Sequence, residues 1–332
     1  MIITRTPFRI SFFGGGTDYP AWYQEHGGVV LATSINKYCY ISCRYLPPFF
    51  EHKSLIAYSK IEMVKSNGDI EHPAVRGVLS YLKIEDGVEI HHDGDLPARS
   101  GLGSSSSFTV GLVHALAALK GKYISKEELA ANAIHIEQNV IHENVGSQDQ
   151  VSAAYGGFSR IEFRHDDTFA VSPVILDKDR LNEFQSHLML CFTGFSRVAS
   201  EIAKSKINNF KSREVELKRM KEMVEEAIQI LQNTGTPIEE FGKLLHQGWL
   251  CKRSLSNKVS TPEIDGIYEA AMRAGATGGK ILGAGGGGFL LLFVKPQLQP
   301  RVYECLKHLI HVPFNFENSG SRVVLYQPSG LS

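Results

Sequence analysis

The sequence predicts an α+β protein with two domains and a cleft between them. Strand-like segments dominate the first half of the chain, and helix-like segments dominate after a change of composition near residue 180. The chain has 332 residues and 43% hydrophobic content, which is enough for two domains with cores of their own. We therefore expect one domain at residues 1–180 and a second at residues 181–332.

The expected strands are rich in β-branched and aromatic residues and are separated by glycine-rich or polar turns. In the first half they lie at 2–14, 28–35, 37–46 and 88–96. Three more follow at 156–163, 169–176 and 187–194.

The expected helices have apolar residues at helical spacing. Segment 105–121 begins with serines, where helix N-caps belong, and 125–141 opens with the capping-box pair Ser125 and Glu128. Segment 199–232 is predicted to be one long charged amphipathic helix. From residue 248 to 294 the pattern reads helix, helix, glycine run and strand, with no strand directly before the glycines.

Composition narrows the possible partners. Lysine plus arginine equals aspartate plus glutamate at 35 each, so no bulk positive field attracts nucleic acid or an anionic membrane. No membrane span or targeting segment is read from the sequence, and a cytoplasmic protein is expected. The five cysteines are scattered without metal-ligand spacing, and Cys39 and Cys43 are read as apolar strand residues. The sequence does not specify an oligomeric state.

A glycine- and serine-rich loop, "PARSGLGSSSSF" at 97–108, precedes the first expected helix. It matches neither a Walker A loop nor a dinucleotide fingerprint. Gly101 and Gly103 would let backbone approach a ligand, and the helix N-terminus offers free N–H groups, which together predict an anion site. The serine hydroxyls add donors or a ligand for Mg²⁺. The alternative is a serine-rich cap on a purely structural helix.

Two further motifs contain glycine turns. In "GAGGGG" at 283–288 the glycines precede a strand, so they are expected to pack against a neighbouring loop or a bound phosphate. In "TPFRISFFGGGTDYP", Arg9 and Asp18 lie on either side of a glycine turn. Taken alone, these two residues would be an ordinary ion-paired arginine and a turn aspartate.

Taken together and in order, the three motifs resemble those of the GHMP kinases, the superfamily of galactokinase, homoserine kinase, mevalonate kinase and phosphomevalonate kinase. The resemblance runs from about residue 4 to residue 292. It implies the two-domain GHMP kinase fold, with an N-terminal ATP-binding domain of ribosomal-protein type and a C-terminal ferredoxin-like α/β domain. The active site of such a fold lies in the cleft between the domains.

The resemblance also implies a site that binds ATP and Mg²⁺. Its ATP loop would comprise Pro97, Arg99, Gly101, Leu102, Gly103, Ser104, Ser105 and Ser106. Ser105, with Ser104 as a further candidate, and Glu137 would hold the metal. Asp149 would be the catalytic carboxylate, acting as a base or orienting the hydroxyl, with Arg9 as the cation beside it. These are the parts that phosphoryl transfer requires.

The acceptor side of the site departs from galactokinases, which read Gly-Glu-His-Thr-Asp where this chain has Gly14 to Asp18 as Gly-Gly-Gly-Thr-Asp. Asp18 matches the aspartate that binds sugar hydroxyls, and the missing side chains leave room for a bulkier sugar. This version of the motif resembles the bacterial D-glycero-D-manno-heptose 7-phosphate kinases. That resemblance implies phosphorylation at the anomeric O1, giving the 1,7-bisphosphate for GDP-heptose and surface polysaccharide.

A phosphorylated acceptor needs a second anion site, for which cationic side chains are the usual solution. The predicted acceptor-binding residues are Gly15, Gly16, Thr17, Asp18, Arg197, Lys252, Arg253, Lys280, Gly285 and Gly286. At least two of the four cations are expected to bind the sugar phosphate. The alternatives are another anomeric sugar kinase of the same fold, fucokinase-like or an N-acetylhexosamine 1-kinase, and a non-catalytic sugar sensor.

Overall fold

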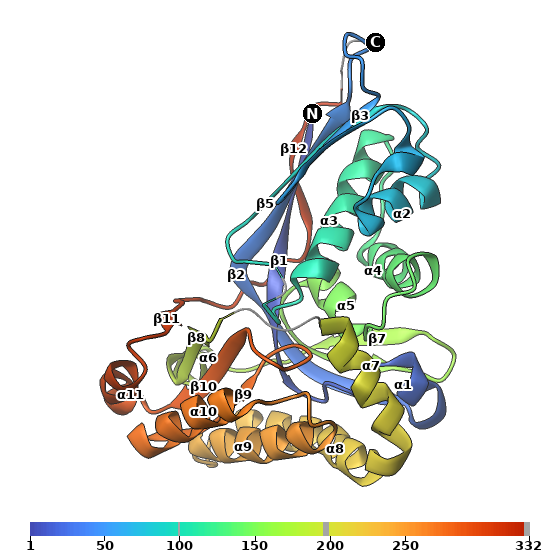
Figure 1. Ribbon diagram of the computed structural model, residues 1–332. Helices are drawn as coiled ribbons and strands as arrows, with labels where there is room; N and C mark the ends of the chain where they lie inside the picture. The colour runs from blue at the N-terminus through green and yellow to red at the C-terminus, as the bar shows by residue number, and fades with distance from the viewer. Residues whose placement is uncertain (99, 195–198, 329–332) are drawn as a thin grey trace.

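A computed structural model describes residues 1–98, 100–194 and 199–328 of the chain (Figure 1). Two β-sheets form the framework. The larger sheet contains β1 (Ile2–Phe13), β2 (Gly28–Tyr45), β3 (Ser54–Ala57), β4 (Ile61–Val64), β5 (Val88–Gly94), β6 (Phe158–Phe163), β7 (Phe169–Pro173) and β12 (Arg322–Tyr326). The smaller sheet contains β8 (Leu188–Phe192), β9 (Ala276–Ile281), β10 (Phe289–Val294) and β11 (Ile310–His311). The expected α+β class is confirmed.

The larger sheet is organised around β2, which pairs with β1 along one edge and with β5 and β6 along the other. The segments predicted as two strands at 28–35 and 37–46 form this single strand. Its first half pairs with β6 and its second half with β5, so one strand connects two parts of the sheet. The order is β12-β1-β2-β5-β3-β4, and only the β3–β5 pairing is parallel.

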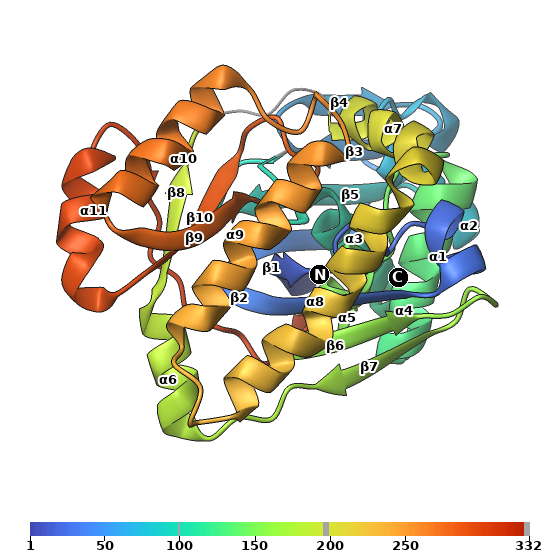
Figure 2. The ribbon, with the colours of Figure 1, turned by 90° about the horizontal axis from the view of Figure 1, so that it is seen from below.

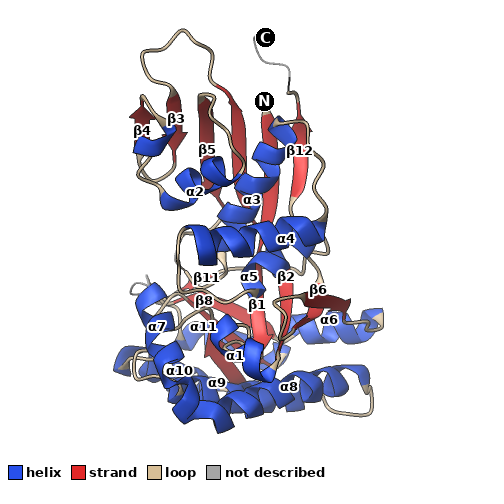
Figure 3. Ribbon diagram, turned by 90° about the vertical axis from the view of Figure 1, so that its right-hand side faces the viewer, coloured by secondary structure: helices blue, strands red, loops and turns tan. Residues whose placement is uncertain are grey.

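Helices cover one face of the larger sheet (Figure 3). They are α2 (Pro73–Tyr81), α3 (Ser104–Leu119), α4 (Lys126–His135) and α5 (Gln148–Tyr155). The predicted cap of α4 is confirmed, since the Ser125 side chain accepts from the Glu128 N–H. The helix then widens into a π-helical turn over Ile136–Val140, which carries Glu137. A short helix that sequence analysis missed, α1 (Pro20–His26), follows the first glycine turn.

The smaller sheet has the order β11-β8-β10-β9 and is antiparallel throughout. The remaining helices are α6 (Lys178–Ser186), α7 (Ala199–Asn209), α8 (Glu214–Gln232), α9 (Glu239–Ser254), α10 (Pro262–Ala274) and α11 (Gln299–Cys305). Helices α8 and α9 run side by side, and α9 packs on the backbone of β9 (Figure 2). A Cβ at Gly278 of β9 would lie 1.9 Å from the Gly242 carbonyl of α9, so glycine is required for this contact.

Two expectations about the second half were wrong, and a third feature of its topology was not predicted. The long helix over 199–232 is divided by a 3₁₀ turn at Phe210–Arg213, because buried Phe210 packs there against Tyr19 and Trp22 of the first half. A strand, β9, does precede the glycine run, so those glycines connect two antiparallel strands. The chain also returns to the larger sheet in β12, and a boundary at residue 180 therefore does not separate the two sheets.

The core is continuous between the sheets. The end of β1 carries Phe12, whose ring packs edge-on to Phe241 of α9 at 5.7 Å and lies 5.4 Å from Phe184 of α6. Phe184 in turn stacks on Phe158 of β6. These rings bury the junction and fix the glycine turn after β1 relative to the smaller sheet. Among the described residues, no helix is long and apolar enough to cross a membrane.

Candidate active site

The glycine loop lies between β1 and the β9–β10 hairpin and leads into α3. Gly103 is the N-cap residue of α3 in the left-handed conformation, with φ of 75°. Gly101 also has a positive φ, 89°, and a Cβ there would lie 2.6 Å from the Leu282 carbonyl. The loop therefore needs glycine at both positions. The N-terminus of α3 presents backbone N–H groups and the partial positive charge that favour an anion.

Arg9 of β1 and Asp149 of α5 form an ion pair directly beneath this loop. Nε and Nη2 of Arg9 donate to the two carboxylate oxygens of Asp149 at 2.8 and 2.7 Å, and Nη1 donates to the Gly101 carbonyl at 2.7 Å. The Arg9 side chain is 3% exposed and that of Asp149 is 25% exposed. A Cβ at Gly103 would touch both side chains at 3.3 Å. The predicted pairing of these two residues is thus present in the structure, next to the anion-binding end of α3.

Glu137 lies on the other side of the α3 N-terminus. Its carboxylate accepts from Ser106 Oγ at 2.9 Å and from the side-chain amide of Gln150, and burial raises its pKa to about 7. In the described part of the chain, Oε1 of Glu137 has no hydrogen-bond partner. A buried carboxylate oxygen without a donor beside a hydroxyl fits a hard cation such as Mg²⁺, which takes one or two protein oxygens and completes its shell with phosphate and water.

Ser106, rather than the predicted Ser105, contacts Glu137. Ser105 was expected beside Glu137, but it is exposed, whereas Ser106 is 3% exposed and contacts the carboxylate. Successive helical residues point about 100° apart, so only one serine of the run can face Glu137. Ser106 becomes the candidate ligand, and Ser104 and Ser105 remain candidates for the phosphates.

Asp18 follows the first glycine turn and is 1% exposed. Its carboxylate accepts from the Gly16 N–H at 2.8 Å and from the Gln148 side-chain amide at 2.9 Å. Burial raises the pKa of this carboxyl, and the negative charge of Asp149 raises it further. The Thr17 hydroxyl donates to the Gly14 carbonyl at 2.8 Å and is directed into the turn, so Thr17 supports the turn while Asp18 supplies the polar group beside Asp149.

Three consecutive residues at the start of α5 contact Asp18, Arg9 and Glu137. Gln148 donates to Asp18, Asp149 accepts from Arg9, and Gln150 donates to Glu137. Asp149 was predicted from the sequence, whereas Gln148 and Gln150 were not. The segment "GSQDQ" does contain a signal for the two glutamines, because they flank the aspartate at the start of a helix.

Comparisons with known proteins agree with this arrangement. Residues 71–157 match the family "GHMP kinases N terminal domain", and residues 235–311 match "GHMP kinases C terminal". A D-glycero-alpha-D-manno-heptose 7-phosphate kinase of Campylobacter jejuni is 30% identical over 325 residues, which cover 92% of this chain and 93% of that protein. The chain belongs to the GHMP kinase family.

Other members align with this GHMP kinase at lower identity. A galactokinase of Pyrococcus furiosus is 26% identical, with 88% of this chain and 89% of that protein covered. Among solved structures, a D-glycero-D-manno-heptose 1-phosphate kinase from "Bacteriodes thetaiotaomicron" superposes with a TM-score of 0.80 at 24% identity, covering 97% and 98% of the two chains. Lactococcus lactis galactokinase complexed with galactose gives a TM-score of 0.74 at 19% identity, with 97% and 94% covered. The predicted GHMP kinase fold and kinase class are confirmed.

The glycine-rich hairpin of this GHMP kinase packs against the glycine loop before α3. The Phe289 N–H donates to the Ser100 carbonyl at 3.0 Å, and a Cβ at Gly283 would lie 2.5 Å from the Cα of Gly101. Gly286 donates its N–H to the Val259 carbonyl at 2.9 Å, so Gly285 and Gly286 pack on the loop before α10. The glycines thus pack against a neighbouring loop, one of the two contacts that the sequence predicted.

The cations predicted to bind the sugar phosphate have partners within the protein. Lys252 donates to the carbonyls of Ile281 and Gly283, and Lys280 donates to the Phe12 carbonyl at 2.8 Å. Both lysines are buried, and burial lowers their pKa values, that of Lys280 to about 7. Arg253 pairs with Asp265 at 2.8 Å. Arg197 and the ATP-loop residue Arg99 lie outside the described residues.

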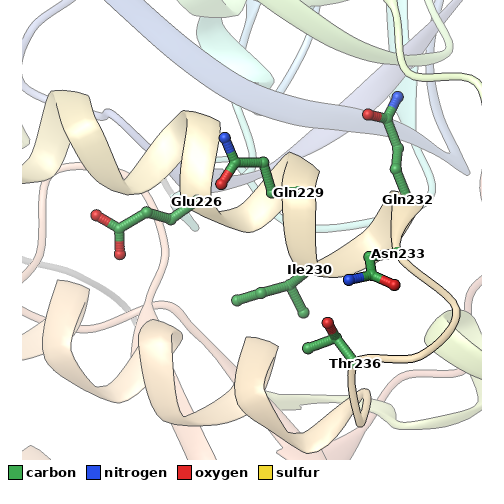
Figure 4. Close-up of a pocket in the computed structure, with 6 residues that line it drawn as sticks. All are labelled: Glu226, Gln229, Ile230, Gln232, Asn233 and Thr236. Atoms are coloured by element: carbon green, nitrogen blue, oxygen red, sulfur yellow. The ribbon is translucent and has the colours of Figure 1, made fainter.

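A surface depression of about 670 Å³ lies elsewhere, where α8 turns into α9. Figure 4 shows the side chains that line it: Glu226, Gln229, Ile230, Gln232, Asn233 and Thr236. Its one carboxylate is engaged by Arg219, and its lining includes no lysine or arginine. The depression is at the end of α8 remote from α7, and its lining lacks the cations and helix N-terminus that phosphate binding requires.

Proposed function

We propose that the protein is an ATP- and Mg²⁺-dependent kinase that phosphorylates O1 of D-glycero-D-manno-heptose 7-phosphate. The observation that carries the proposal is the row Gln148, Asp149 and Gln150, which joins the acceptor aspartate, the Arg9 ion pair and the metal carboxylate at one helix start. Similarity over almost the full length of a heptose 7-phosphate kinase supports the acceptor. The product would be the 1,7-bisphosphate used for GDP-heptose and bacterial surface polysaccharide, made in the cytoplasm.

The residues divide the chemistry between them. Asp149 accepts a hydrogen bond from the O1 hydroxyl through a lone pair that Arg9 leaves free, which aligns O1 with the γ-phosphorus. The O1–P bond forms as the P–O bond to ADP breaks, and the proton leaves O1 along its hydrogen bond to Asp149. The N–H groups at the start of α3 and the Arg9 guanidinium stabilise charge on the transferred group. Glu137 and Ser106 would hold Mg²⁺, which neutralises phosphate charge when bound.

The sugar end of the site supports an acceptor larger than galactose. A Cβ at Gly15 would lie 3.5 Å from Ser11 Oγ and from the Gln148 side-chain nitrogen, so a longer side chain there would extend toward the groups around Asp18. A Cβ at Gly16 would lie 3.1 Å from Leu217. Because glycine occupies both positions, the turn itself places no side chain beside Asp18.

A second candidate is an anomeric kinase for an unphosphorylated sugar. This candidate is favoured because Lys252, Arg253 and Lys280 each have a hydrogen-bond partner within the protein. None of these three cations is left unpaired to receive a sugar phosphate. Two bifunctional proteins with fucokinase activity in their names, from Arabidopsis thaliana and Bacteroides fragilis, are 24% and 26% identical to this chain. The chain spans 29% and 35% of their lengths, so any shared activity would concern one part of each.

The test is ADP release from Mg²⁺-ATP with a panel of acceptors. The panel contains D-glycero-D-manno-heptose 7-phosphate, the corresponding 1-phosphate, mannose, mannose 6-phosphate, fucose, galactose and N-acetylglucosamine. We expect turnover with the 7-phosphate only, and its loss in Asp149→Ala. The 1-phosphate is included because that compound has no free O1 and would have to be phosphorylated elsewhere. Turnover on a free sugar would select the second candidate, and no turnover with any acceptor would favour a sugar sensor.

A further inference from the structure

Lys206 on α7 is buried beside the acceptor aspartate, and sequence analysis did not single it out. Its side chain is 4% exposed. Within residues 1–98, 100–194 and 199–328, the ammonium group has neither a hydrogen-bond acceptor nor an ion-pair partner at bonding distance. Its one close partner is the ring of Tyr19, whose centroid lies 5.4 Å from Nζ. A cation–π contact of this kind replaces only part of the hydration that a buried ammonium group loses.

The surroundings of Lys206 contain more positive than negative charge. Lys206 interacts electrostatically with Asp18 and Asp149, and it repels Lys252 and Lys280. When all are ionised, four cations (Arg9, Lys206, Lys252 and Lys280) face two carboxylates (Asp18 and Asp149), a surplus of two positive charges. Burial and mutual repulsion lower the pKa values of the three lysines accordingly. A buried surplus of positive charge is costly unless an anion joins it.

Lys206 differs from the other three cations in having no acceptor in the described structure. Arg9 donates to Asp149, and the other two lysines donate to backbone carbonyls, where they link the glycine-rich hairpin and β9 to the rest of the site. These contacts are sufficient to explain why those three are buried. The hydrophobic cluster around α7, which includes Tyr19, Ala203 and Phe210, gives the ammonium group of Lys206 no comparable contact.

We infer that Lys206 is a substrate-contacting residue whose ammonium group binds a phosphoryl oxygen next to Asp18 and Asp149. This inference rests on the proposed phosphoryl transfer. The phosphoryl group has two sources, the γ-phosphate of ATP during transfer and the acceptor's own phosphate. In either case the anion supplies the missing acceptor for Lys206.

The first test measures binding and stability without any turnover. Thermal unfolding of the full chain is followed with and without inorganic phosphate for wild type, Lys206→Met, Lys206→Arg and Lys204→Met. Lys204 is exposed on the same helix and serves as the matched control. We expect Lys206→Met to be at least as stable as wild type without phosphate, because an apolar chain replaces an unpaired buried charge. It should need at least about tenfold more phosphate for the same stabilisation, while the Arg variant should keep the response.

The second test distinguishes the two sources of the phosphoryl group. If Lys206 binds the γ-phosphate, kcat of Lys206→Met falls by at least about tenfold with every acceptor that wild type uses. If it binds the acceptor's phosphate, KM rises only for phosphorylated acceptors. Wild-type kinetics together with an unchanged phosphate response would overturn the inference, as would a Met variant that loses stability but keeps that response. Because the phosphate response is read without turnover, the inference is tested even if the proposed kinase activity fails.

Discussion

Gly146 lies so close to Asp18 that a Cβ on it would stand 2.0 Å from the carboxylate oxygen Oδ2. The neighbouring Ser147 N–H donates to the main-chain carbonyl of Asp18 at 2.9 Å. The loop before α5 is therefore held against the turn after β1 by backbone contact. No side chain can be added at position 146 without moving the acceptor carboxylate.

Gly146→Ala is accordingly expected to impair acceptor use through Asp18. The methyl group would displace the Asp18 carboxylate from its contacts with Gly16 and Gln148, and a shift of about 1 Å in a reacting group can cost about 100-fold in rate. We expect kcat/KM for the acceptor to fall by about that factor. KM for ATP should change little because the α3 loop is untouched. Steady-state kinetics with each substrate varied in turn measures both.

The control for this variant is Gly266→Ala on α10, where a Cβ would meet nothing within 4 Å. Alanine within a helix is more stable than glycine by about 0.5–1 kcal/mol, so this protein should be fully active and slightly more stable. Wild-type acceptor kinetics in Gly146→Ala would show that the position of Asp18 is unimportant for catalysis.

Arg9→Lys tests whether the guanidinium geometry matters or only its charge. Arg9 donates to both oxygens of Asp149 and to the Gly101 carbonyl from three nitrogens, and a lysine ammonium cannot reproduce this fork. We expect kcat to fall by about 10²–10³, comparable to the loss of one transition-state donor. Arg160→Lys is the control, because Arg160 also bridges two carboxylates, Glu162 and Glu225, but on the surface. Equal kcat values for the two variants would contradict the role of Arg9.

The sequence predicted the parts of the site that depend on local pattern. The glycine loop, the strand before it and the Ser125 cap of α4 follow from turn chemistry and periodicity, and the resemblance to known kinases supplied Arg9 and Asp149. The serines expected to cap α3 do not do so, because Gly103 is its N-cap residue. Strand β9 was missed because Gly278 and Gly279 have low β propensity. Gly278 is explained by the close packing of α9, and Gly279 by the close approach of Leu291 and Leu292 on β10. Strand β12 pairs with β1 across almost the whole chain, a contact that no local pattern indicates.

The burial of Lys252 and Lys280 could not be predicted from the sequence, for a physical reason. Lysine is rarely buried, so Lys252 and Lys280 were interpreted as exposed cations ready for a phosphate. Instead, both ammonium groups donate hydrogen bonds to backbone carbonyls at the ends of strands. These carbonyls come within reach only when β1 and the hairpin meet. Lys206 was overlooked for the same reason, since its helix reads as a solvated charged segment. The choice between Ser105 and Ser106 depended on the exact first residue of α3, which sequence pattern fixes only to within one or two positions.

Ser106→Ala and Ser105→Ala form a pair that tests the metal assignment. Ser106 contacts Glu137, whereas Ser105 is exposed, so we expect only Ser106→Ala to raise the Mg²⁺ concentration needed for half-maximal activity. Loss of one ligand or of its orientation typically costs about 10–100-fold in metal affinity. The measurement is a Mg²⁺ titration of activity at saturating nucleotide and acceptor. A larger effect in Ser105→Ala would restore the assignment made from the sequence.

Lys280 is expected to make the free energy of unfolding rise with pH, a direction that is unusual for a lysine. Burial, followed by repulsion from Arg9 and Lys206, lowers the pKa of Lys280 from 10.5 to about 7. Below pH 7 the folded and unfolded states both hold the proton, so its contribution to the free energy of unfolding is constant there. Between about pH 7 and pH 10 only the unfolded state holds it, and the unfolding free energy contributed by this residue rises with pH.

Comparison with Lys280→Met isolates that contribution from the other titrating groups. Denaturant unfolding of both proteins is measured at intervals from about pH 6 to pH 9.5, and the free energy of the variant is subtracted from that of wild type. The difference should be flat below pH 7 and should then increase by up to about 1.4 kcal/mol per pH unit. The hydrogen bond to the Phe12 carbonyl does not alter this slope, because a neutral amine can also donate. A difference that stays flat to pH 9.5 would mean that Lys280 remains protonated when buried. The surplus of positive charge around Asp18 and Asp149 would then persist in the free protein, and neutralising it would fall to the bound anion alone.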